Sequence, residues 1–233
     1  MADTEHLNRV RLPSAVYDLA IRLGASPEQT WFDIQLKQIG RMKRNLSTAS
    51  WMQFTATQTI STSDCAFDWL AKFTPFGVIS ARDALCDGVG RLDIMAFGLI
   101  PIARMPHTPA LVRGELMRYL AELAFAPDAI LHNAALTWRV ISADTLAVSA
   151  GTGETWSEVI LSLDGEGRIG GAFALDRPRS ATAPTLPTPW RGRFSDYRRH
   201  CDHWIPFAGE VAWEFDGREH TYWQGQLVEW DLC

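Results

Sequence analysis

The sequence has few features of secreted, membrane-spanning or metal-binding proteins. Four cysteines are scattered over 233 residues with no C-x-x-C pair, which predicts reduced thiols, mostly small buried side chains, and no disulfide framework. The first 13 residues are charged, so we expect no signal peptide. No run approaches the roughly 18 apolar residues of a membrane span. We therefore expect a cytoplasmic protein without stable membrane insertion.

Long basic runs and cofactor motifs are also missing. Lysine and arginine total 22 against 27 acidic residues, a net charge of −5. Nucleic-acid binding depends on concentrated positive charge, so we expect no nucleic-acid partner. Residues 165–170, "GEGRIG", match a dinucleotide pattern, but a strand-like segment follows where that motif needs a helix, so we interpret them as a turn. We expect no cofactor.

The chain does contain two segments with helical character. Residues 12–24, "LPSAVYDLAIRLG", have Pro13 near the start and Gly24 where a helix cap is favoured. Residues 109–125, "PALVRGELMRYLAELAF", combine helical periodicity with strong helix formers, and Pro127 is expected to end them. We expect residues 108–125 to form the longest or second-longest helix.

The other segments alternate between apolar and polar residues, as strands do. In residues 31–44, Phe32, Ile34 and Leu36 fall on one face and polar residues on the other. Further strands are predicted within 51–62, 65–73, 78–88, 90–103, 136–144, 145–151, 157–164 and 168–176, with three more within 189–232, and turns at 164–167 and 215–219.

Roughly ten short strands with two helices predict an α+β fold built on a curved antiparallel sheet, either a half-barrel or a barrel. We expect an N-terminal helix and a central helix across the concave side. No composition shift suggests a second domain, so residues 1–233 are predicted to form one domain. Within it, residues 1–26 would form an N-terminal helical segment and residues 27–233 the curved sheet.

The segment "GELMRYLAEL", residues 114–123, places four polar side chains on one helical face. At about 100° per residue, Glu115, Arg118, Tyr119 and Glu122 fall within an arc of roughly 100°, and leucines flank them. Arg118 can pair with Glu115 or with Glu122. The face either meets solvent with surface ion pairs, or covers a cavity where Arg118 binds an anion and a carboxylate moves a proton.

Residues 200–204, "HCDHW", contain residue types that bind metals. On a strand, neighbouring side chains point to opposite faces, so the four cannot converge on one ion. We therefore expect no metal site, and we expect His203 to lie near the rim of a pocket.

Five stretches together carry a family resemblance: "GRLDIMAFGLIPIA", "GELMRYLAEL…PDAIL", "LTWRVI", "PWRGRFSDY" and "IPFAGEVAWEFDG…YWQGQL". From about residue 30 onward the chain resembles a broad bacterial family classed as a domain of unknown function. Its marks are a G-E-x-x-R-Y-L-A-E helix, here 114–122, and a G-E-V-A-W strand, here 209–213. The resemblance implies a fold similar to lipoprotein and lipid carriers of the LolA and LolB type. It implies no catalytic residues. The chain departs from the family pattern at Asp202 and His203, which suggests a remodelled pocket rim.

Three functional hypotheses follow. The first is binding of a small, mostly apolar molecule, lipid-like or polyketide- or terpenoid-like, in the cavity of the sheet. Its walls would contain Trp51, Trp69, Trp138, Trp213 and Tyr222, and its polar end Glu115, Arg118, Tyr119 and Glu122. The second is a cofactor-independent cyclase, isomerase or hydrolase using Glu115, Glu122 or His203. The third is a structural or stress-related protein whose cavity is filled by its own side chains.

Overall fold

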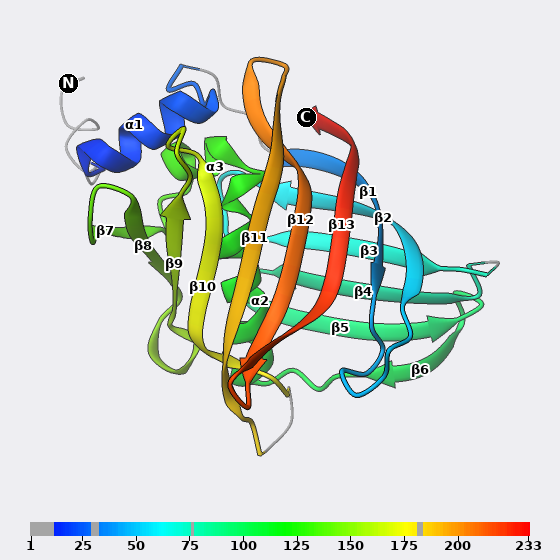
Figure 1. The fold of residues 1–233 in the computed structure, drawn as a ribbon. Helices are drawn as coiled ribbons and strands as arrows, with labels where there is room; N and C mark the ends of the chain where they lie inside the picture. Colours follow the sequence, from blue (N-terminus) through cyan, green and yellow to red (C-terminus); the bar gives the residue numbers. More distant parts are fainter. Residues whose placement is uncertain (1–11, 29–32, 76, 181–183) are drawn as a thin grey trace, which may run out of the picture.

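The computed structural model describes residues 12–28, 33–75, 77–180 and 184–233. Its main element is an antiparallel sheet of 13 strands in the order β6-β5-β4-β3-β2-β1-β13-β12-β11-β10-β9-β8-β7 (Figure 1). The strands are β1 Asp33–Met42, β2 Met52–Ser61, β3 Phe67–Phe73, β4 Ile79–Cys86, β5 Val89–Ala96, β6 Ile100–Arg104, β7 Thr137–Val140, β8 Thr145–Ala150, β9 Ser157–Leu163, β10 Ile169–Pro178, β11 Pro187–His200, β12 His203–Phe215 and β13 Arg218–Leu232.

The sheet forms a half-barrel around one helix. The helices are α1 Ser14–Leu23, α2 Pro109–Ala121 and α3 Pro127–His132, with 3-10 turns η1 Glu122–Ala124 and η2 Gly153–Thr155. Helix α2 contacts β4 and β5 near one edge of the sheet and β8, β9 and β10 near the other. The sheet must therefore curl so that both margins reach α2, which lies on the concave side as predicted (Figure 1). At 13 residues α2 is also the longest helix.

The alternation read from the sequence is visible in the burial of the strands. Ile34 and Leu36 on β1 are buried, while Gln35 and Lys37 between them are exposed; Phe32 lies outside the described residues. Strands β2 and β3 repeat the pattern. The buried face of the sheet and the almost fully buried α2 together form the core.

Both predicted helix ends can be compared with the structure. Gly24 closes α1 with φ 101°, and a side chain there would collide with the backbone of Asp202, so only glycine fits. Helix α2, by contrast, ends at Ala121, before Pro127. Pro127 instead begins α3, a third helix that was not predicted, because a proline is well suited to the first turn of a helix.

The expectation of about ten strands is too low. Residues 90–103 were expected to form one strand, but they span β5 and β6, joined by a tight turn at Phe97 and Gly98 with φ 52° and 69°. Phenylalanine rarely adopts this left-handed conformation, so the sequence does not signal a turn there. The predicted Asp216–Gly217 turn and the turn at 164–167 are present.

His203 lies in the core, so its expected position at a pocket rim is wrong. Cys201 and Asp202 form the turn between β11 and β12, and His203 begins β12 with 5% exposure. Its Nε2 is 2.9 Å from the carboxylate of Asp128 on α3, and its ring packs against Trp230. The pairing with a fully buried carboxylate explains why the imidazole lies beneath α3.

All four cysteines are free thiols, but the expectation that they are buried is wrong for three of them. Cys86, Cys201 and Cys233 are exposed because they lie at turns and at the end of the last strand, and Cys65 is half-buried. Across the four described ranges, no group of three or more His, Cys, Asp or Glu side chains could hold a metal ion. Among the same residues, no helix is long and apolar enough to cross a membrane.

The buried His203–Asp128 pair makes a pH-dependent prediction. Nδ1 of His203 lies 2.8 Å from the carbonyl oxygen of Cys201, so both ring nitrogens face oxygen atoms, an arrangement that favours the charged ring. Burial disfavours the charged ring, but the bonds to Asp128 and Cys201 raise the pKa of His203 above its ordinary 6.5. The stabilisation is therefore complete below pH 6.5 and is lost as the pH rises through the raised pKa.

We expect His203→Gln to lower the free energy of unfolding by about 3 kcal/mol at pH 6, because it leaves a buried carboxylate unpaired. The loss should shrink at pH 9. Denaturant titrations at both pH values measure it, with His200→Gln as the control, since His200 also packs on Trp230 but holds no carboxylate. Equal losses at both pH values would contradict a charged pair.

Candidate functional site

A cavity of about 470 Å³ lies between α2 and the concave face of the sheet, within the usual size range of small-molecule sites. Most of its lining is aromatic or aliphatic: Met42, Met52, Trp69, Phe73, Ile79, Ala81, Leu92, Ile94, Ile102, Leu111, Ala121, Phe125, Trp190, Phe194, Val211, Trp213 and Trp223. The third hypothesis requires a cavity that is filled by the protein's own side chains. This cavity is open instead.

Only some of the predicted aromatic residues reach the cavity. Trp69, Trp213 and Tyr222 line it. Trp51 does not, and instead packs beneath the cations of Arg41 and Lys43. Trp138, on the edge strand β7, packs against the core.

Sequence reasoning missed other aromatic residues of the wall. Trp190 and Trp223 line the cavity without having been predicted. A signal for Trp190 was present, because Trp190, Gly192 and Phe194 alternate along β11 and all face the cavity.

The polar face of α2 is divided between the cavity and the core. Glu115, Arg118 and Glu122 line the cavity. Tyr119 does not: it is fully buried, donates a hydrogen bond to the Ser61 carbonyl at 3.0 Å and accepts one from Asn133 at 2.9 Å. Tyr119 thus connects α2 to β2 and to the end of α3 rather than to a ligand.

Arg118 is held between two carboxylates. Its Nη1 lies 2.6 Å from Asp83 Oδ2 and its Nε lies 2.8 Å from Glu122 Oε1, with all three side chains at most 15% exposed. Gln58 donates to the second oxygen of Glu122, and the guanidinium lies 4.7 Å from the Phe67 ring. The pairing with Glu122 is one of the two predicted, and the pairing with Asp83 was missed. The charge of Arg118 is therefore shared by two carboxylates of the protein.

Asp83 was missed although the sequence contains a signal for it. Ala81, Asp83 and Leu85 share one face of β4, so a carboxylate stands among small and apolar residues at an inward position.

Glu115 is a buried carboxyl beside the cavity. It is 4% exposed, and burial raises the pKa of its carboxyl well above the usual value. The nearby Asp83 carboxylate raises this pKa further, against the opposing effect of Arg177 and Arg118. A buried carboxyl with a raised pKa at a cavity wall is a candidate proton donor, and the Oε2 atom of Glu115 has no hydrogen-bond partner among the described residues.

Arg177 on β10 is a buried cation in the cavity lining, close to Gly114 on α2. It is 8% exposed, with its guanidinium 4.4 Å from the Trp190 ring and 5.7 Å from the Trp213 ring. Beside it, the hydroxyl of Tyr222 accepts a hydrogen bond from Trp190 Nε1 at 3.1 Å. Within the described ranges no carboxylate forms an ion pair with Arg177.

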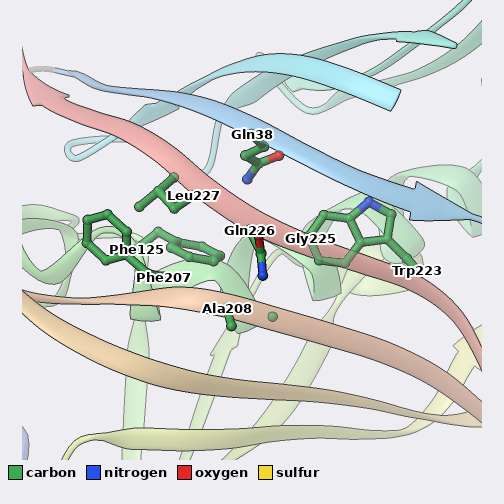
Figure 2. A pocket seen from close by; sticks show the side chains of 9 residues that line it. Gln38, Phe125, Phe207, Ala208, Trp223, Gly225, Gln226 and Leu227 are labelled. Atoms are coloured by element: carbon green, nitrogen blue, oxygen red, sulfur yellow. The ribbon is translucent and has the colours of Figure 1, made fainter. Parts of the chain in front are cut away.

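A second hollow lies along β12 and β13, which pair only from Ala208 and Gln226 onward (Figure 2). Phe125, Phe207 and Leu227 are among the side chains that line it. It has no room for a water molecule. The larger cavity under α2 is therefore the candidate site.

The chain belongs to a family of proteins of unknown function, DUF6544, whose model matches residues 3–225. The family resemblance drawn from the motifs is thus confirmed. No curated protein matches the chain.

Solved structures provide an independent comparison of the fold. A LolA superfamily protein from Nitrosomonas europaea superposes with a TM-score of 0.51 at 9% identity, covering 94% of this chain and 92% of that one. A beta-barrel-like protein of the DUF1849 family from Brucella abortus has a TM-score of 0.23 at 10% identity, with 87% and 98% covered. The first match shows a shared fold with the LolA superfamily, as the motifs implied.

We expect Arg118→Met to lower the free energy of unfolding by about 3 kcal/mol, because it leaves Asp83 and Glu122 largely buried without their cation. Arg82→Met is the matched control, since Arg82 pairs with Asp68 on the surface with both side chains more than 40% exposed. The control should lose less than about 1 kcal/mol. Similar small losses in both variants, measured by denaturant unfolding, would contradict the role of Arg118.

Glu115→Gln tests whether the folded protein raises the pKa of the Glu115 carboxyl. Because its folded-state pKa lies above 4.5, the folded protein binds more protons than the unfolded chain, and stability falls as the pH rises above 4.5. Glutamine removes this titration, so the variant should gain stability relative to wild type between pH 5 and pH 8. Thermal melts at both pH values measure the difference, with the exposed Glu154→Gln as control. A variant that loses stability relative to wild type over this range would show that Glu115 is ionised.

Proposed function

We propose that the protein binds a small, mostly apolar molecule, lipid-like or polyketide- or terpenoid-like, in the cavity beneath α2. The observation that carries this proposal is the cavity of about 470 Å³ with walls built mainly from tryptophan, phenylalanine and aliphatic side chains. Apolar walls supply the driving force for binding, and a few polar groups orient the molecule.

The arrangement of α2 supports this function. The helix is buried on nearly every side, yet the small residues Gly114 and Ala121 stand at the cavity beside Glu115 and Arg118. Charged side chains that open onto a cavity are costly on a helix with a purely structural role. A ligand site, by contrast, requires such polar groups. The half-barrel shared with a LolA superfamily protein is compatible with the same role.

The alternative is a cofactor-independent cyclase, isomerase or hydrolase acting on an apolar substrate in this cavity. The observation that favours it is the buried Glu115 at the cavity wall, where burial raises the pKa of its carboxyl and makes it a candidate general acid next to the ionic pair of Arg118 and Glu122. His203 has no part in this alternative, because it pairs with Asp128 away from the cavity lining.

Gly114→Leu tests the binding function. A Cβ at Gly114 would lie 3.9 Å from Arg177, so a leucine extends into the cavity, and leucine favours a helix over glycine. We expect wild-type protein to bind the neutral dye Nile red with a rise in fluorescence, and Gly114→Leu to lose most of that binding. Gly165→Leu is the matched control, since a Cβ there meets nothing within 4 Å. Equal dye binding by Gly114→Leu and the control would place the dye outside the cavity.

A further inference from the structure

Arg177 is a buried cation that forms no ion pair among the described residues, although its charge acts on the nearby carboxyl of Glu115. At 8% exposure its guanidinium is largely removed from water, and among the described residues it neither pairs with a carboxylate nor donates to any acceptor. The rings of Trp190 and Trp213 compensate part of the lost hydration through cation–π contact, but they leave its N–H groups without acceptors. A buried cation in this state is costly unless an anion joins it.

A second free donor lies in the same corner of the cavity. The Tyr222 ring stacks on Trp213 at 6.0 Å, and its oxygen already accepts the bond from Trp190 Nε1. The hydroxyl proton of Tyr222 therefore remains available, and no described residue accepts it. The charge of Arg177 acts directly on the Tyr222 hydroxyl, so the two groups are neighbours.

We propose that the ligand is an amphipathic acid, with an apolar tail along the aromatic and aliphatic wall and a carboxylate that accepts hydrogen bonds from Arg177 and the Tyr222 hydroxyl. A planar guanidinium beside a hydroxyl matches the two oxygens of a carboxylate. This inference rests on the proposed binding function and adds the chemistry of the headgroup.

The carboxylates on the α2 side of the cavity disfavour a second negative charge on the ligand, whereas Lys43, Arg44 and Arg179 lie elsewhere in the lining. Arg118 is already shared by Asp83 and Glu122, so it has little left to offer a ligand. Those two carboxylates line the same cavity and would repel a second negative charge. A carboxylate therefore suits the site better than a phosphate monoester, which carries up to two charges.

Three twelve-carbon probes separate the headgroup from the tail: dodecanoate, dodecan-1-ol and dodecyl phosphate, titrated at pH 8 and followed by tryptophan fluorescence. We expect wild-type protein to bind dodecanoate about tenfold more tightly than the alcohol, as charged hydrogen bonds predict, and more tightly than the phosphate. Arg177→Met should remove this preference and leave alcohol binding unchanged. Arg191→Met is the matched control, because Arg191 also lies over an aromatic ring, Phe173 at 4.5 Å, but does not line the cavity.

Two further measurements separate ligand binding from a structural role. Ligand-free Arg177→Met should melt at or above the wild-type temperature, because no ion pair is lost. A clearly lower melting temperature would show that Arg177 serves to neutralise the cavity carboxylates, and would overturn the proposal. Tyr222→Phe keeps the ring, and should weaken dodecanoate binding without affecting the alcohol.

The outcomes distinguish this inference from the function on which it rests. Equal binding of dodecanoate and dodecan-1-ol by wild-type protein would overturn the headgroup assignment and leave the apolar site intact. Tighter binding of dodecyl phosphate would replace the carboxylate with a phosphate and also overturn it. If none of the three binds and Nile red also fails to bind, both proposals fall.

Discussion

The ion pairs of Arg118 with Asp83 and Glu122 determine how α2 sits inside the sheet. The pair with Asp83 joins the helix to β4, on one margin of the half-barrel, and Glu122 holds the guanidinium from one turn further along the same segment. The opposite side of α2 packs against β8, β9 and β10. A helix with an apolar face all round would draw the sheet inward by packing. An ionic face does not, because burying it against apolar strands would leave its charges without partners. The cavity follows from this constraint.

The two polar regions of the cavity have different states. On α2 the charge of Arg118 is shared between Asp83 and Glu122, and burial together with the nearby Asp83 raises the pKa of Glu115. On β10 the guanidinium of Arg177 has aromatic contacts but no anion. The ion pairs of Arg118 keep the cavity open. The guanidinium of Arg177 is already positioned to bind an anionic group of a ligand. This division explains why one cavity contains both a satisfied and an unsatisfied arginine.

The sequence was sufficient for a curved antiparallel sheet with a central helix on its concave side, because both depend on local periodicity. It left open whether the sheet is a half-barrel or a barrel, and whether the polar face of α2 meets solvent or a cavity. It was insufficient where backbone irregularities intervene. Alternation from Ala172 and Ala174 would direct Asp176 inward, but a β-bulge shifts the register so that Arg177 is buried instead. His203 was misplaced because its partner, Asp128, is 75 residues away in sequence and lies on a helix that was not predicted. Neither a β-bulge nor a pairing between residues far apart in the chain changes the hydrophobic periodicity of the sequence, so neither could be predicted from it.

Native mass spectrometry of the purified chain, after incubation with a total lipid extract, tests the central claim most directly. The account predicts that wild-type protein carries one bound molecule, and that denaturation releases it as a singly charged acid with a long apolar tail. Gly114→Leu should carry none. Protein that remains bare after incubation, or that carries the same passenger in both forms, would contradict the claim that the cavity beneath α2 is a binding site.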